Sequence, residues 1–170
     1  SLRCPRLSKS GSMARFQRQN DGMRARDLAE SAPFVAPDDP AIEALRVLTT
    51  AGLPGVVVRS GLTFAVIPAS QVLRVLLPQY VLDDPSLGRV WDEASADSFA
   101  ARLADPHVSD LVKALGLSDD LPEPAVEGDA TLVEVAAVMA AARVPLVAVV
   151  DDGHFVGVVT VNRLVGRLIA

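Results

Sequence analysis

The chain has 170 residues, of which 50% are hydrophobic and 22% charged, enough apolar material for one compact domain or for two small units that share a core. Its net charge is −5, but seven of its basic residues and a single acid fall within residues 1–26. The remainder holds nine basic and 20 acidic residues, a net charge of −11. Such an acidic body repels a phosphate backbone, so we expect it to bind no nucleic acid.

Residues 1–22 combine basic side chains with no apolar periodicity, and we expect a disordered leader or an expression remnant here. The segment lacks the apolar stretch of a secretory signal, and no run of about 18 apolar residues occurs anywhere to span a membrane. Cys4 is the single cysteine, which excludes an internal disulfide. These features predict a cytoplasmic protein.

Residues 23–78 form the first predicted unit. Ile42, Leu45 and Leu48 recur at helical spacing. A β-branched run follows, and Ser60-Gly61 favours a tight turn between two short strands. After the first helix, the predicted elements are a strand over Val56–Val58, a strand over Phe64–Ile67 and a helix over Ala69–Leu77.

Residues 79–106 form a predicted helical linker between two similar units. This linker contains Pro85 and Trp91, and its composition predicts a helix over Ala96–Leu103. An aromatic ring in such a linker more often packs on the core than stacks on a ligand, so we expect Trp91 to anchor the linker.

Residues 107–170 repeat the pattern of the first unit at a spacing of 91–92 residues, with Glu43 falling on Glu134 and Pro54 on Pro145. The repeat predicts a helix carrying Leu132, Val135 and Met139, strands over Val147–Val150 and Phe155–Val159 joined at Asp152-Gly153, and a closing helix over Val161–Ile169. One such unit cannot bury both faces of its small sheet, so we expect the two units to pack together.

The paired units resemble a tandem of cystathionine-β-synthase-type (CBS) domains, often called a Bateman module. The resemblance rests on Val147–Thr160 with the Ala-rich helix before it, on the opening Met23–Leu28 and on Leu53–Val58. It covers residues 23–78 and 107–170, and it extends to small stand-alone CBS-domain proteins of bacteria. It implies an α/β fold of two repeats, each with a small sheet and two helices, packed sheet to sheet in a pseudo-twofold arrangement.

Proteins of this family are regulatory, and many bind adenosine-containing ligands between the repeats and form disc-shaped dimers. The resemblance therefore implies a homodimer that binds AMP, ATP or a related ligand and acts in trans on an effector such as an enzyme or a transporter. It implies no cofactor. We expect no enzyme and no metal site, because His107 and His154 lack partners at ligand spacing and Asp151 and Asp152 are adjacent residues in a turn.

In the family, a Thr or Ser after the second strand lies near phosphate, and an Asp three positions later holds the ribose hydroxyls. Thr160 matches the first position in repeat 2, but Arg163 stands at the second, and repeat 1 has Pro68 and Gln71 there. The resemblance gives as candidate ligand-binding residues Thr160, Arg163, Gly157, Pro145 and Leu146 in repeat 2, with a weaker site at Pro54, Gly55, Pro68 and Gln71 in repeat 1.

Loss of the carboxylate lowers the expected ribose affinity of each site by about one to two decades. Arg163 lies in the first turn of the helix that Thr160 would cap, where its positive charge is unfavourable by ~0.3–1 kcal/mol because it opposes the helix dipole. A bound anion would make the electrostatics at this helix end favourable. Alternatively, Arg163 is solvated or pairs with Asp151 or Glu134. Two hypotheses stay open: a sensor that binds an adenosine nucleotide or another anion, and a ligand-free dimerisation module with degenerate clefts.

Overall fold

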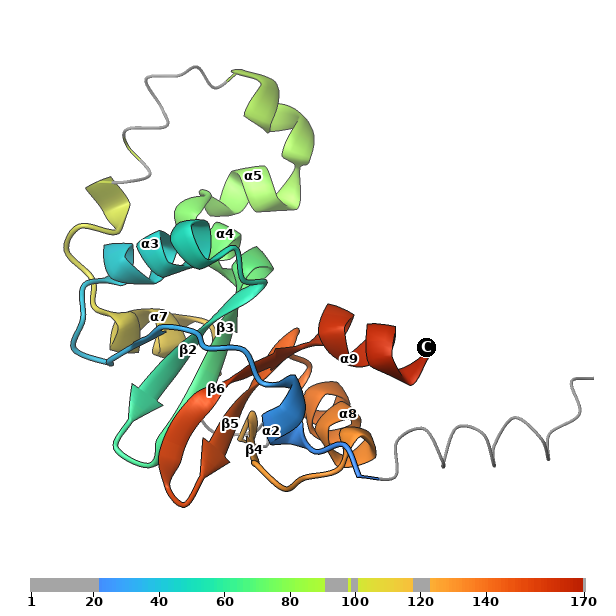
Figure 1. The fold of residues 1–170 in the computed structure, drawn as a ribbon. Helices are drawn as coiled ribbons and strands as arrows, with labels where there is room; N and C mark the ends of the chain where they lie inside the picture. The colour runs from blue at the N-terminus through green and yellow to red at the C-terminus, as the bar shows by residue number, and fades with distance from the viewer. Residues whose placement is uncertain (1–21, 91–97, 99–100, 118–122, 170) are drawn as a thin grey trace, which may run out of the picture.

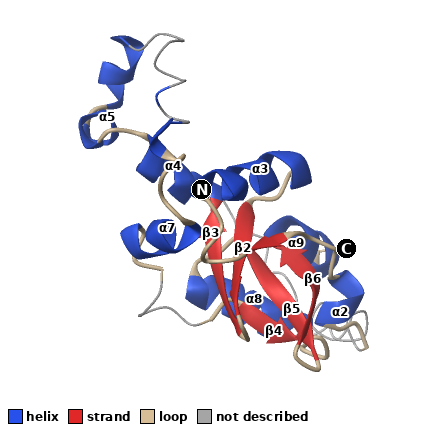
Figure 2. Cartoon of the chain, turned by 90° about the vertical axis from the view of Figure 1, so that its left-hand side faces the viewer, coloured by secondary structure: helices blue, strands red, loops and turns tan. Residues whose placement is uncertain are grey.

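The computed structural model describes residues 22–90, 98, 101–117 and 123–169. Two three-stranded sheets face each other at the centre of this part of the chain, and helices flank them (Figures 1 and 2). The α/β fold of two packed repeats is thereby confirmed. Residues 1–21 of the predicted leader, Trp91 and half of the predicted helix over Ala96–Leu103 lie outside the described residues. No helix in the described ranges is long and apolar enough to cross a membrane.

The first repeat contains the predicted order of helix, hairpin and helix. Its elements are α3 (Ala41–Ala51), β2 (Gly55–Ser60), β3 (Thr63–Pro68) and α4 (Ala69–Leu76). A short strand, β1 (Phe34–Val35), pairs in parallel with β2 and completes the sheet. The sequence analysis did not predict β1, because two residues are too few to show an alternating pattern.

The second repeat has the same order, with α8 (Leu132–Ala142), β5 (Leu146–Asp151), β6 (His154–Thr160) and α9 (Val161–Leu168). Its additional parallel strand is β4 (Ala125–Glu127), which pairs with β5 and was likewise not predicted. The hairpin turns at Asp152 and Gly153, whose φ angles of 49° and 75° are those that an Asp-Gly turn favours. Thr131 caps α8, because its side chain accepts a hydrogen bond from the Glu134 backbone N–H.

Between the repeats, α5 (Gln79–Asp83) and the 3-10 helix η1 (Pro85–Val90) project away from the sheets beyond α4 (Figure 1). The two sheets meet in an apolar layer. The buried members of that layer are Val57, Phe64, Val66, Leu146, Ala148 and Val158. Phe155 closes one edge of the layer, with its ring centroid 5.9 Å from that of Phe64.

The opening helix of each repeat packs in the core of the other repeat. In α2 (Ala25–Leu28), Ala25 and Leu28 are buried among residues of β4, β5, β6, α8 and α9. In α7 (Val108–Ala114), Val108 and Leu111 are buried among residues of β1, β2, β3, α3 and α4. Backbone hydrogen bonds hold each opening helix against the other repeat. The Ala25 N–H donates to the Ala130 carbonyl and the Val108 N–H donates to the Asp39 carbonyl, each at 2.9 Å.

After α2 the chain continues across β6, where Glu30 and Val158 exchange two backbone hydrogen bonds of 2.9 Å. Gly157 makes this crossing possible. A Cβ atom at position 157 would lie 2.2 Å from the Glu30 carbonyl oxygen, which is closer than any van der Waals contact. We call residues 24–31 the strap, because they tie the first repeat to the second.

Replacing Gly157 with Ala should destabilise the protein by about 1–3 kcal/mol, because the methyl group displaces the strap and breaks the two Glu30–Val158 hydrogen bonds. Urea unfolding measures the change. Gly166→Ala in α9 is the matched control, since nothing lies within 4 Å of its added Cβ, and it should stabilise the protein by roughly 0.5–1 kcal/mol. Equal stability of Gly157→Ala and the parent protein would show that the strap does not need this close approach.

Candidate functional site

A cleft of about 620 Å³ opens where the two repeats meet, and residues of both repeats line it. Repeat 1 contributes Pro54 and the segment Pro68–Gln71 at the start of α4. Repeat 2 contributes Pro145 and residues of α8 and α9. Four of the predicted ligand-binding residues, Pro54, Pro68, Gln71 and Pro145, are therefore in one cleft.

The two prolines before the strands play the same backbone role in both repeats. The Pro54 carbonyl accepts a hydrogen bond from Ala69 N–H at 2.9 Å, and the Pro145 carbonyl accepts one from Val161 N–H at 2.8 Å. Each proline thereby satisfies a free N–H at the start of a closing helix. These paired contacts hold α4 and α9 at the cleft.

The lining of the cleft is largely apolar. It includes Ala136, Met139, Ala140, Val144, Leu164 and Leu168. Its polar side chains are Ser70 and Gln71, and Gln71 Oε1 accepts a hydrogen bond from Arg74 at 3.3 Å. Arg143 is the one charged residue among the described residues that line the cleft.

Arg143 is a residue of the cleft that the predicted site residues did not include. It follows α8 with φ 55° and ψ 42°, the left-handed conformation, and its N–H donates to the Met139 carbonyl. Gly52 takes the equivalent place after α3, with φ 62° and ψ 27°. An arginine in this conformation destabilises the fold by about 1–2 kcal/mol. Its positive charge at the helix C-terminus stabilises the fold by ~0.3–1 kcal/mol. The repeat alignment of Gly52 with Arg143 was the signal that could have found it.

Thr160 and Arg163 lie outside the residues that line the cleft. Thr160 caps α9, its hydroxyl accepting from Arg163 N–H at 3.4 Å. The Arg163 guanidinium forms an ion pair with Glu30 of the strap, and both side chains are nearly half exposed. Arg163 therefore pairs with neither of the expected partners, Asp151 and Glu134, and Asp151 pairs with Arg26 at 3.2 Å.

The other three predicted residues are enclosed by the protein. Leu146 is fully buried between the sheets. Gly55 is buried beside β3, where an added Cβ would lie 3.0 Å from the Ile67 carbonyl oxygen. Gly157 is covered by the strap. Each of these positions has a packing reason for its residue type, and their predicted contact with a ligand stays a prediction.

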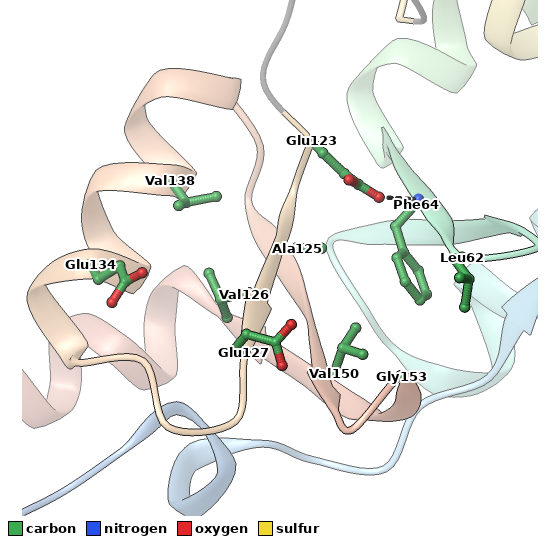
Figure 3. Close-up of a pocket in the computed structure, with 10 residues that line it drawn as sticks. All are labelled: Leu62, Phe64, Glu123, Ala125, Val126, Glu127, Glu134, Val138, Val150 and Gly153. Atoms are coloured by element: carbon green, nitrogen blue, oxygen red, sulfur yellow. Dashed lines mark hydrogen bonds between the residues drawn. The ribbon is translucent and has the colours of Figure 1, made fainter.

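A second pocket, of about 420 Å³, lies near the hairpin turns, between β4, α8 and the β2–β3 hairpin (Figure 3). Three carboxylates, those of Glu123, Glu127 and Glu134, surround a floor of apolar side chains. Glu123 accepts a hydrogen bond from Phe64 N–H at 2.6 Å, which joins the second repeat to the edge of the first sheet. The acidic lining makes this pocket unsuitable for an anion, and within the described ranges no cluster of His, Cys, Asp and Glu could hold a metal ion.

The family model for the CBS domain matches residues 108–170. A CBS domain-containing protein of unknown function from Kribbella flavida is 42% identical in sequence, covers 88% of this chain and 100% of its own, and superposes with a TM-score of 0.70. The chain belongs to the CBS-domain family. CBS-domain proteins are generally regulatory rather than catalytic.

More distant CBS proteins share the fold. The protein CBSX2, solved in complex with AMP, is 18% identical, with coverage of 87% of this chain and 97% of its own and a TM-score of 0.54. The CBS domain of a bacterial CNNM/CorC family Mg²⁺ transporter, solved in complex with ATP, is 12% identical, with coverage of 96% and 98% and a TM-score of 0.59. No curated protein sequence matches the chain.

Replacing Arg163 with Gln should lower the free energy of unfolding by no more than ~1 kcal/mol, because ion pairs between exposed side chains contribute little. Urea unfolding of the variant beside the parent protein checks this. A loss of several kcal/mol would mean that the Arg163–Glu30 pair holds the strap, in place of the backbone hydrogen bonds and the buried side chains of α2.

Proposed function

We propose that this CBS pair is a sensor that binds a small ligand in the inter-repeat cleft and acts on a partner protein in trans. The observation that carries the proposal is the shared lining of the cleft, to which both repeats contribute. A ligand that contacts both repeats binds best to one relative position of the two, so it shifts the population toward that position. A partner such as an enzyme or a transporter would respond to this shift, and a cytoplasmic location is part of the same proposal.

An adenosine nucleotide or another anion is the ligand class that the family supports. CBS domains of the same fold have been solved with AMP and with ATP. In repeat 2, an anion at Thr160 and Arg163 would replace the Glu30 carboxylate, which already neutralises the guanidinium. Glu30 is therefore an internal competitor for any anion at this position.

AMP or ATP at ~100 times its dissociation constant should raise the stability of the protein by ~2.7 kcal/mol, which a thermal shift assay detects. If the anion contacts Arg163, Arg163→Ala should weaken binding by ~10-fold or more, whereas Glu30→Gln should strengthen it by removing the competing charge. Asp151→Asn is the matched control, because it breaks the Arg26 ion pair of the same strap. Equal affinities of all four proteins would exclude a role for Arg163 in binding.

A ligand-free dimerisation module is the second candidate function. The internal pairing of Arg163 with Glu30 and the covering of Gly157 favour it, because repeat 2 then needs no ligand at these residues. Absence of any thermal shift with AMP and ATP would support this second function over nucleotide sensing.

The closing helices also support a homodimer. On α9 and just beyond it, Val161, Val165 and Ile169 recur every four residues and are 38%, 44% and 81% exposed. Leu73 on α4 is 54% exposed. Val161 and Val165 also line the cleft, and an exposed apolar stripe is stabilised when a second copy covers it.

Ile169→Asp should convert the proposed dimer to a monomer, because it places a charge in the apolar stripe of α9. Sedimentation velocity at micromolar concentration measures the change. Leu62→Asp is the control, since Leu62 is 77% exposed but lies at the β2–β3 turn, away from the closing helices. A parent protein that sediments only as a monomer would refute the dimer.

A further inference from the structure

We propose that the inter-repeat cleft takes an amphipathic anion, with an apolar body and one carboxylate or phosphate head, and that Arg143 binds the head. This inference rests on the proposed ligand-binding function of the cleft and departs from it in the class of ligand. It is carried by two independent observations, the conformation of Arg143 and the chemistry of the surrounding side chains.

Arg143 occupies a backbone position that glycine fits better. Its φ of 55° is in the left-handed region, and repeat 1 has Gly52 at the equivalent helix end. Among the described non-glycine residues, only Asp152 shares a positive φ, and it precedes Gly153 in a hairpin turn that favours aspartate. The left-handed conformation of Arg143 ends α8 as that of Gly52 ends α3, but the choice of arginine has no such local reason, since arginine has no particular tolerance for this conformation. A strained residue that persists at a cleft is a reason to look for function there.

The Arg143 side chain is exposed, and within the described part of the chain no carboxylate or hydrogen-bond acceptor pairs with it. The other arginine near the repeat junction, Arg163, is already paired with Glu30. Arg143 is thus the available cation at the cleft, and a guanidinium binds a carboxylate or a phosphate through two parallel hydrogen bonds.

The remaining lining selects against a nucleoside. No aromatic ring is present among the described lining residues to stack on a base, and no carboxylate is present to accept hydrogen bonds from the two ribose hydroxyls. Aliphatic side chains of α8 and α9, among them Met139, Leu164 and Leu168, form the wall instead. Such a wall suits an alkyl or other apolar body, and Arg143 at its edge suits a single anionic head.

Calorimetry with octanoate, octyl phosphate, 1-octanol and AMP tests the proposal on the full chain. Both octyl anions should bind the parent protein more tightly than 1-octanol does. Arg143→Gly should weaken the binding of both anions by about tenfold and leave the affinity for 1-octanol unchanged. The same variant should melt at a higher temperature, because glycine relieves the left-handed backbone. Arg143→Lys should retain most of the affinity for octyl phosphate, and preference for one octyl anion over the other identifies the head group.

The outcomes separate the inference from the function on which it rests. Equal affinity of the parent protein and Arg143→Gly for both octyl anions would overturn the role of Arg143. Binding of AMP without binding of either octyl anion would overturn the ligand class while leaving a ligand-binding cleft. Binding of none of the four compounds would overturn the sensor function together with this inference. Arg46→Gln is the matched control, because it removes an exposed guanidinium of α3 that does not line the cleft, and it should leave the affinity for both octyl anions unchanged.

Discussion

The exchange of opening helices is the constraint on which the rest of the structure depends. Leu28 is buried in the core of the second repeat and Leu111 in that of the first, so neither core is complete without a segment from the other repeat. Fully burying a leucine side chain contributes about 1.5–3 kcal/mol, a large fraction of the stability of a small domain. The two repeats consequently form one folding unit, although the sequence divides into two copies.

This exchange also determines which positions a ligand can reach. The part of the strap after α2 crosses β6 on its way to the first sheet, where it covers Gly157 and brings Glu30 to Arg163. The opening helix of the second repeat, α7, contacts the first repeat through the hydrogen bond from Val108 N–H to the Asp39 carbonyl. In the first repeat, Pro68 and Gln71 line the open cleft. The predicted ligand positions of the two repeats therefore differ in access as well as in sequence.

The sequence was sufficient to predict α3, α4, α8, α9 and the two hairpins, which carry their pattern locally, but it did not predict the short helices α2, α5 and α7. It was insufficient for β1 and β4, which have two and three residues and exist because they pair in parallel with β2 and β5. The Glu30–Arg163 pair joins residues 133 positions apart, so no local pattern could show it. The placement of Thr160 as a helix cap was predictable because capping is a property of the residue and its immediate neighbours.

The charge of the chain limits which contacts could bind an anionic ligand at the proposed site. Beyond residue 26 the chain carries a net charge of −11, so at long range it repels anions. Physiological salt screens exposed charges over about 8 Å, which leaves recognition to groups in direct contact with the ligand. Arg143 is the one positively charged residue in the described lining of the cleft, and the side chains around it are largely apolar. If an anion binds at this cleft as proposed, its affinity would come from burial of its apolar part together with one short-range guanidinium contact.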